Sequence, residues 1–495
     1  MSEKHSKGSE EDVKTEEVHD ERATSPVGEP TASWLAEEKK LVRRFDRRIL
    51  PMACLLYLFA YLDRTNLGNA KLLSLKQDAL GGDPTGQLFD WVNSAFFFTY
   101  ILFQIPATIV SKLFPPRIWL ACAAMGWGLS STLMSTAFNF GGMMAARFFL
   151  GIFEAGFGPS IPLYFSLFYT KEEMGLRMAY WFGFAAVAGA FGGIIAFGVG
   201  QLEDHLSFAT WRLLFIVEGI PAILLGVAAL FFLPNRPEST TFLNEREREI
   251  ALARVNRATS SDVGQLVNKS HIGFAFRDWR IYAGGVIYFG LNASLASTSA
   301  FLPTIMNTLG YSKSKSQLMT VPPYAVAAIV LTSLSAFSDR IQSRGIFMMF
   351  ATALGGIGYL ILLVVPTNLQ ARYFATFCIT SGTYTAIGII IAWYAHNLGS
   401  ETKKATGVPM FMAIGQCGSV LGSHLLPDPE GPKYTKGFAV CCALEFLATL
   451  CALVLTISYR MDNARRDKKY GVPDPNEKVD VSELADKAPG FRYVP

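Results

Sequence analysis

Long apolar stretches separated by short polar segments dominate the chain between residues 48 and 459. Twelve of these stretches are close to the roughly 20 residues that a helix needs to cross the hydrocarbon core of a bilayer. Backbone N–H and C=O groups find no water at that depth, so sheets and open loops are excluded and helices are expected. The predicted spans are residues 48–68, 89–110, 118–137, 143–168, 177–200, 211–233, 280–303, 319–338, 346–366, 373–396, 405–426 and 436–459.

Charged residues avoid these spans. Of the 495 residues, 51% are hydrophobic and only 17% are charged, and most of the charge falls in residues 1–48, 235–280 and 460–495. This composition predicts an all-α integral membrane protein whose first partner is the lipid bilayer. The net charge of +4 is too small, and lies too much in the tails, to indicate nucleic acid as a partner.

The polar segments divide the chain into five parts. Roughly three times as many Lys and Arg residues flank the spans on the side of the termini as on the other side, which predicts that both termini are cytoplasmic. The predicted parts are a disordered cytoplasmic tail (1–45), an N-terminal six-helix bundle (46–234), a cytoplasmic central loop with a short helix (235–278), a C-terminal six-helix bundle (279–460) and a second disordered cytoplasmic tail (461–495).

The two six-span halves resemble each other at an offset near 226 residues. Arg147-Phe148-Phe149 at the fourth span matches Arg372-Tyr373-Phe374 at the tenth, and Arg177 at the fifth matches Lys404 at the eleventh. Matches at one offset indicate duplicated halves, which is the plan of transporters that bind substrate between two bundles. We therefore predict two pseudo-symmetric six-helix bundles.

Four ionisable residues concentrate in two of the predicted spans, the first and the fourth. Asp63 and Arg64 are in the first span, and Arg147 and Glu154 are seven residues apart on one face of the fourth. Charge at this depth is costly and usually functional, although a structural ion pair is the alternative. A buried carboxyl can exchange a proton, and arginine binds carboxylates with a fixed fork of donors. We therefore expect proton coupling at Asp63 and Glu154 and substrate binding at Arg64 and Arg147.

Other polar residues within the spans are weaker candidates. Glu218 lies about two turns from Arg212 and can pair with it, whereas Glu445 has no partner within its own helix. We expect a C-terminal substrate-binding wall and, at one helix end, a set of gating residues. The expected wall residues are Asn292, Tyr384, Trp393, Tyr394 and Gln416, and the gating residues are Asp339, Arg340 and Arg344. Interface anchoring is the alternative role for Trp393 and Tyr394.

Several kinds of chemistry are not indicated. No Gly-rich segment is followed by the Gly-Lys-Ser/Thr of a phosphate-binding loop, and the six histidines are not spaced as metal ligands. The seven cysteines all fall in apolar stretches and are odd in number, which argues against a disulfide framework. We expect neither an enzyme nor a metal site, and no cofactor beyond the proton as coupling ion.

Three sequence runs carry a resemblance to a known family. They are LDRTNLGNAK from Leu62, RFFLGIFEAG from Arg147 and QLMTVPPY from Gln317. With these runs the chain resembles the fungal allantoate-permease group, within the anion:cation symporter family of the major facilitator superfamily. A departure is the loop at residues 111–117, which lacks the acidic residue usual in the superfamily.

The resemblance implies the major facilitator fold, with twelve helices around a central cavity and alternating access. It also implies proton-driven import of a small organic anion, such as a vitamin, ureide or carboxylate, across the plasma membrane, with nicotinate as the first substrate to test. Acidic and arginine residues of relatives match Asp63, Arg64, Arg147 and Glu154. Two other functions stay open: export of a fungal secondary metabolite and, from a different class, nutrient sensing as a receptor.

Overall fold

The computed structural model describes residues 32–111, 113–205, 207–258, 269–473 and 479–495. Its regular elements within these ranges are helices. The N-terminal half contains α2 (Leu50–Leu72), α3 (Leu75–Ala79), α4 (Gln87–Ser111), α5 (Pro116–Met134), α6 (Phe140–Phe157), α7 (Ser160–Phe165), α8 (Lys171–Gly200), η1 (Glu203–His205) and α9 (Thr210–Phe232).

The C-terminal half repeats the same order of long helices. It contains α12 (Trp279–Thr308), α13 (Lys313–Leu318), α14 (Val321–Ile341), α15 (Arg344–Val364), α16 (Leu369–Asn397), α17 (Glu401–Ser423), η2 (Asp428–Glu430) and α18 (Thr435–Tyr470). Each of the twelve predicted spans therefore coincides with a long helix among the described residues, the fourth being continued by α7. This agreement confirms the predicted fold class.

Nine of these helices are long and apolar enough to cross a membrane by length and composition, within the described part of the chain. The other three long ones are α2, α5 and α17. Two of them are more polar because α2 carries Asp63, Arg64 and Lys71, and α17 begins with Glu401 and two lysines. The polar residues that lower their hydropathy are thus partly those expected to carry function.

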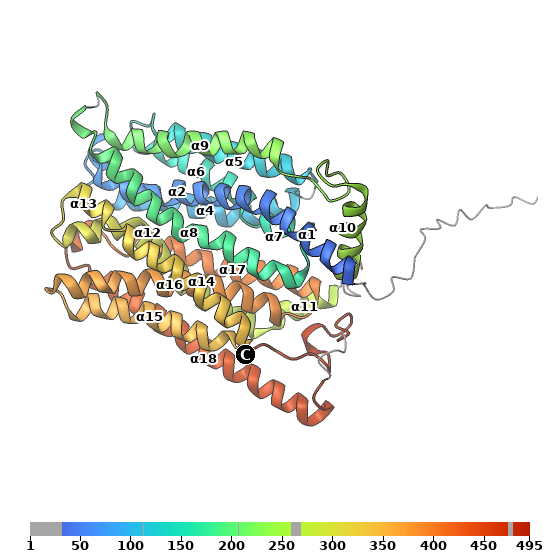
Figure 1. Ribbon diagram of the computed structural model, residues 1–495. Coiled ribbons are helices and arrows are strands. Elements are labelled where there is room, and N and C mark those ends of the chain that lie inside the picture. The colour runs from blue at the N-terminus through green and yellow to red at the C-terminus, as the bar shows by residue number, and fades with distance from the viewer. Residues whose placement is uncertain (1–31, 112, 206, 259–268, 474–478) are drawn as a thin grey trace, which may run out of the picture.

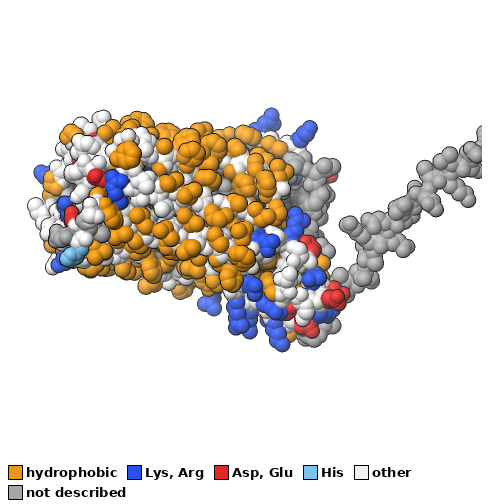
Figure 2. Space-filling view, turned by 90° about the horizontal axis from the view of Figure 1, so that it is seen from above, with side chains coloured by type: hydrophobic (Ala, Val, Ile, Leu, Met, Phe, Trp, Pro, Cys, Tyr) orange, Lys and Arg blue, Asp and Glu red, His pale blue; other side chains and the backbone are white. Residues whose placement is uncertain are grey.

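The outer surface of the helices is apolar, as a bilayer requires. Large side chains such as Leu102, Ile109, Phe231, Ile329 and Val364 are more than 60% exposed. Figure 2 shows hydrophobic side chains covering the middle of the molecule, with Lys and Arg gathered towards the ends. Such a continuous apolar surface is unfavourable in water and fits hydrocarbon.

The two halves pack by the same scheme. In the N-terminal half α5 packs on α9 and α4 on α6; in the C-terminal half α15 packs on α18 and α14 on α16. The halves meet through α2 against α12, α4 against α17 and α8 against α14. Glycines permit these approaches: a Cβ on Gly68 would lie 2.5 Å from the carbonyl oxygen of Ala300.

The segments outside the bundles gather at one end of the molecule, which we call the tail end; the opposite end is the far end. α1 (Ala32–Arg48), α10 (Glu245–Ala258) and α11 (Lys269–Arg277) lie there, together with residues 479–495 (Figure 1). Arg44 of α1 bonds Glu247 of α10 at 2.6 Å. Asn244 and Glu247 form the reciprocal cap expected at the start of α10.

Both tails differ from the expectation of disorder where they are described. Residues 32–48 form α1, and Phe45 of this helix is fully buried; residues 1–31 and, in the central loop, 259–268 lie outside the described residues. α18 continues to Tyr470, and residues 479–495 then fold back against the C-terminal half. Both segments are ordered by tertiary contacts, which local composition does not reveal.

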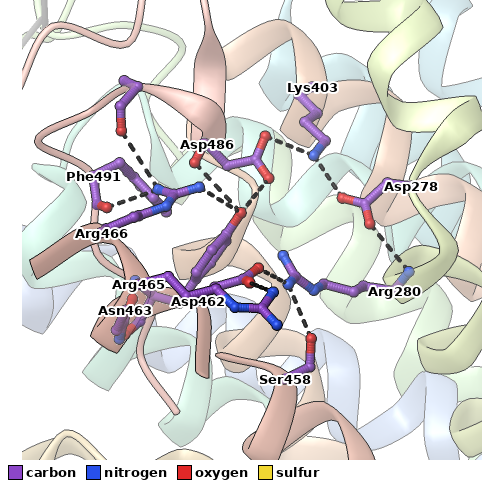
Figure 3. Close-up of polar contacts among 12 residues, drawn as sticks. Asp278, Arg280, Lys403, Ser458, Asp462, Asn463, Arg465, Arg466, Asp486 and Phe491 are labelled. Carbon is purple, nitrogen blue, oxygen red and sulfur yellow. Dashed lines mark hydrogen bonds and ion pairs between the residues drawn. The ribbon is translucent and has the colours of Figure 1, made fainter. Parts of the chain in front are cut away.

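Figure 3 shows how the C-terminal segment is held. Lys403 bonds Asp278 at 2.6 Å and Asp486 at 2.7 Å, so it joins α17, the start of α12 and this segment. Arg466 of α18 donates to the carbonyl oxygen of Phe491 at 2.8 Å. The segment therefore ties together the tail ends of three helices of one half.

Candidate functional site

A cavity lies between the two halves near the middle of the bundle. Polar and apolar side chains of α2, α4, α12 and α17 surround it. Its lining comprises Tyr61, Arg64, Leu67, Gly68, Asn93, Phe97, Asn292, Leu295, Ala296, Ser299, Ala300, Gln416 and Ser419. Among these described residues, Arg64 alone carries a full charge.

Arg64 forms an ion pair with Glu154 beside this cavity. The Arg64 Nη2 atom lies 2.6 Å from Glu154 Oε2, and the side chains are 19% and 2% exposed. The guanidinium also stands over the rings of Phe96 and Tyr100, at 4.8 and 5.1 Å from their centroids. Arginine favours this combination of carboxylate and aromatic face because its guanidinium is planar and weakly hydrated.

Glu154 keeps a second carboxylate oxygen without a partner. Its Oε1 atom is buried and makes no hydrogen bond with the part of the chain that the structure describes. Since Arg64 is partly open to the cavity and Glu154 is not, the arginine can contact a small molecule in the cavity while the carboxyl stays behind it. In this pair, Arg64 is accessible from the cavity, whereas Glu154 is buried.

Asp63 points away from the cavity, although it is next to Arg64 in sequence. Successive residues of a helix are about 100° apart, so the two side chains leave α2 in different directions. Asp63 is fully buried, accepts a hydrogen bond from Ser131 of α5, and has no partner for Oδ2. The structure therefore separates the two acids that the sequence grouped together.

Arg147 is fully buried within the N-terminal half. Its terminal nitrogens lie 3.5 Å from the main-chain carbonyl oxygens of Asp63 and Arg64. Arg147 does not line the cavity, so the structure does not give it the direct substrate contact that we expected. Its positive charge lies between α2, which carries Asp63, and α6, which carries Glu154.

Three of the five residues expected in the C-terminal wall lie at or beside the cavity. Asn292 and Gln416 line it, and the Tyr384 hydroxyl lies 2.8 Å from that of Tyr61. Tyr394 does not lie there, and its hydroxyl donates to the main-chain carbonyl oxygen of Arg280 at 2.5 Å. Nor does Trp393: it is fully buried at the tail end, where its indole N–H donates to the carbonyl oxygen of Val494 at 2.8 Å. It is neither a cavity residue nor an exposed interface anchor.

Sequence reasoning missed several polar residues of the site. Asn93 and Ser419 line the cavity, and Ser131 holds Asp63. Asparagine within an apolar span was a usable signal for Asn93. Serines are common in membrane helices, where they bond their own backbone, so Ser131 and Ser419 carried no distinct signal.

Two other acids have different surroundings from those expected. Arg212 pairs with Asp78 of α3 at 2.7 Å and not with Glu218, whose two oxygens are buried without a hydrogen-bond partner. Glu445 accepts a hydrogen bond from Thr383 of α16 at 3.0 Å, so its partner comes from another helix. Glu218 and Glu445 are 227 residues apart, on the last long helix of each half, and both are fully buried.

The expected gating residues flank the turn between α14 and α15: Asp339 and Arg340 are in the last turn of α14, and Arg344 is the first residue of α15. Arg344 is buried and its Nη2 atom bonds Asp339 Oδ1 at 2.8 Å, whereas Arg340 is exposed. Asp339 and Arg344 thus lock two helix ends of one half together.

The far end is closed by contacts between the halves. Lys71 of α2 bonds Asp428 of η2 at 2.7 Å, and Asn93 of α4 donates to Ser423 of α17 at 2.9 Å. Burial alone would raise the pKa of Asp428, but Lys71 and Lys76 outweigh it and hold that pKa below its usual value. The carboxylate therefore stays charged and holds both lysines.

The comparisons agree with this geometry. The family model described as Major Facilitator Superfamily matches residues 53–423. The chain is similar to the major facilitator-type transporter hxnP of Emericella nidulans, 34% identical over 464 residues, which are 92% of this chain and 93% of that protein. It is also similar to the high-affinity nicotinic acid transporter of Saccharomyces cerevisiae, 28% identical over 92% of this chain and 85% of that protein.

Solved structures show the same fold. The xylose transporter XylE from E. coli, in a partially occluded inward-open conformation, superposes with a TM-score of 0.64 at 14% identity, covering 88% of this chain and 100% of that one. A bacterial homologue of the human lysosomal transporter Spinster, inward-facing and occupied, gives 0.62 at 13% identity, covering 84% and 97%. The chain therefore belongs to the Major Facilitator Superfamily and is a membrane transporter.

Proposed function

We propose that this transporter moves a small organic anion together with a proton, and that Arg64 and Glu154 couple the two. The observation that carries the proposal is the 2.6 Å ion pair between a cavity-lining arginine and a carboxylate hidden behind it. Because Arg64 is the charged residue of the cavity lining, a substrate that pairs with it is an anion.

Coupling follows from competition for Arg64. While Glu154 is ionised it occupies the guanidinium, and an incoming carboxylate meets an arginine that is already neutralised. Protonation of Glu154 removes that charge and frees Arg64 for the substrate. Protonation and anion binding thus favour each other, which is positive linkage between two ligands.

The residues that line the cavity also bear on the chemical character of the anion. Phe97, Tyr61 and Leu295 supply apolar surface, whereas Asn292 and Gln416 supply amide groups on the C-terminal side. This combination suits a small, flat carboxylate with one further polar group. Nicotinate fits this description, and similarity to a nicotinic acid transporter makes it the first compound to test.

The direction we propose is import across the plasma membrane, with the tail end in the cytoplasm. The excess of Lys and Arg beside the spans on the side of the termini supports this orientation. In the proposed orientation, the far end with its interhalf contacts faces the outside of the cell.

Uptake into proteoliposomes with an imposed pH gradient tests the proposal. We expect radiolabelled nicotinate, or another small carboxylate from a panel, to accumulate only when the outer pH is the lower one, and to acidify the lumen. Glu154→Gln should bind the anion but lose the dependence on the gradient. Glu430→Gln, an acid remote from the cavity, is the matched control. Uptake by the wild type that ignores the gradient would refute proton coupling, and export-only activity would refute the direction.

A further inference from the structure

A lysine links the two halves beyond the cavity. Lys71 lies in the last turn of α2, one turn after Gly68, and its Nζ atom is 2.7 Å from Asp428 Oδ1. Lys76 of α3 is ion-paired with the other carboxylate oxygen. Two cations of the N-terminal half therefore hold one anion of the C-terminal half, and the far end cannot open until both pairs break.

Two phenyl rings enclose the ammonium group of Lys71. Its Nζ atom lies 4.7 Å from the ring centroid of Phe89 and 4.5 Å from that of Phe301. Phe89 belongs to α4 and Phe301 to α12, and the two buried rings meet edge to face with centroids 6.0 Å apart. Ala300, the residue before Phe301, lines the cavity, so this cluster lies directly beside the cavity lining.

The main chain of the N-terminal half fits closely around Asp428. Gly86 has a φ of +77°, in the left-handed region, and a Cβ there would lie 3.1 Å from Asp428 Cγ. Glycine adopts this φ without strain and leaves room for the Asp428 side chain. Lys71, Lys76 and Gly86 thus form a binding site for the Asp428 carboxylate of the C-terminal half.

A second carboxyl group beside Lys71 belongs to the same half. Asp90 is 3% exposed, and its Oδ1 atom makes no hydrogen bond with any of the described residues. It directly follows Phe89, whose ring centroid lies 4.7 Å from Lys71 Nζ, and the charges of Asp90 and Lys71 interact. Asp83 is not available to Lys71, because its Oδ2 atom already accepts a hydrogen bond from the main-chain N–H of Phe89 at 3.0 Å. Asp90 is therefore the carboxyl that can receive Lys71 if Asp428 moves away.

We propose that Lys71 is the switch residue of the far-end gate: it pairs with Asp428 when the gate is closed and passes to Asp90 when the gate opens. Removing one partner from a buried ion pair leaves an uncompensated charge, which is costly. A replacement carboxylate on the same half avoids this state during opening. The inference concerns the opening of the cavity and holds for any substrate, with or without proton coupling.

Hydrogen–deuterium exchange of the full-length chain in lipid nanodiscs tests the gate without a substrate. The readout is exchange in peptides of α2 and α12 that line the cavity, because their amides become accessible from the far end only when the halves part. Asp428→Asn removes the charge that both lysines hold, so we expect roughly tenfold faster exchange there. Glu430→Gln is the matched control, because Glu430 bonds Lys436 at 2.9 Å within the C-terminal half.

The role of Asp90 needs a second comparison. Asp90→Asn combined with Asp428→Asn should exchange more slowly than Asp428→Asn alone, because the open state has lost its acceptor for Lys71. An equal or faster rate in the double variant would overturn the handover. Exchange in Asp428→Asn equal to the wild type would overturn the gate itself, provided that both proteins melt at the same temperature. Failure of proton-driven anion uptake would leave both results unaffected.

Discussion

The hydroxyl groups of Tyr61 and Tyr384 lie 2.8 Å apart and join the two halves beside the cavity. The Tyr61 ring is also 5.6 Å from the guanidinium carbon of Arg64. The residue that links the halves therefore contacts the residue that we expect to bind the anion. A shift of Arg64 towards a substrate acts on Tyr61 directly, so substrate binding and the relative position of the halves are connected by one side chain.

Removing this link should change transport more than folding. Tyr384→Phe deletes one hydrogen bond, worth about 1 kcal/mol, in the conformation with the far end closed. We expect a several-fold change in the initial rate of uptake at saturating substrate, with little change in melting temperature. Tyr373→Phe is the control, because the Tyr373 hydroxyl donates to Met319 within the C-terminal half. Equal rates for Tyr384→Phe and wild type would show that the contact is incidental.

The chemistry of Arg64 predicts a specific loss on conservative substitution. Lysine keeps the positive charge but lacks the planar fork and the stacking on Phe96 and Tyr100. Arg64→Lys should therefore raise KM for the anion by roughly tenfold or more, with a smaller effect on the maximal rate. Titration calorimetry on the purified protein measures the same loss as a weaker Kd.

Arg212→Lys serves as the comparison for that experiment, since Arg212 pairs with Asp78 far from the cavity. If both substitutions weaken binding equally, Arg64 has no special role. If neither does, the anion is bound elsewhere.

The sequence predicted the twelve spans because their length and apolarity are local properties. It also predicted that Asp63, Arg64, Arg147 and Glu154 lie at membrane depth, because this follows from their position within a span and not from the direction of their side chains. It could not predict which of two neighbours faces the cavity, because that depends on how α2 is rotated against α5 and α12. The sequence therefore grouped Asp63 and Arg64 in one site. In the structure Asp63 accepts a hydrogen bond from Ser131, whereas Arg64 pairs with Glu154.

The C-terminal segment shows the same limit on a larger scale. The polar composition of residues 479–495 predicts disorder. In the structure, however, Val494 accepts a hydrogen bond from Trp393, 101 residues earlier. Order that depends on a distant partner leaves no trace in local composition. The mistaken place of Trp393 in the predicted wall has the same origin, because its true partner lies in that segment.

This difference can be tested by comparing Trp393→Phe with Gln416→Ala. Trp393→Phe removes a buried indole hydrogen bond at the tail end, so it should cost about 1 kcal/mol of stability and leave KM unchanged. Gln416→Ala removes a cavity amide, so it should change KM and barely alter the melting temperature. Uptake kinetics and thermal melting of both variants check the two expectations. A raised KM for Trp393→Phe would return that residue to the substrate site.

The far-end ion pairs also predict a pH dependence. Lys71 and Lys76 hold the pKa of Asp428 below its usual value despite its partial burial, so the pairs contribute stability above the unfolded pKa of about 4. That contribution is lost only as the pH falls through the lower folded value. Exchange at the far end, corrected for the intrinsic rate, should therefore stay constant between about pH 7 and pH 5. A rise across that interval would mean that another group controls closure.

The strongest effect on stability is expected at Lys403. Its side chain is 1% exposed, and its ammonium group lies between two carboxylates, at 2.6 Å from Asp278 and 2.7 Å from Asp486. Asp486 also accepts from the Tyr493 hydroxyl at 2.9 Å, so the lysine fixes the folded-back segment against α12 and α17. Lys403→Met leaves two like charges together without their counter-ion, which should cost about 3–5 kcal/mol.

The expected result for Lys403→Met is a clearly lower melting temperature with an unchanged Kd for the substrate, because the cluster is at the tail end and the cavity is not. Adding Asp278→Asn and Asp486→Asn removes the repulsion and should restore much of the loss. Lys433→Met, at an exposed lysine of the far end, should have no effect. Full stability of Lys403→Met would show that the segment is held by its apolar and main-chain contacts alone, and a weakened Kd would show that the tail end communicates with the cavity.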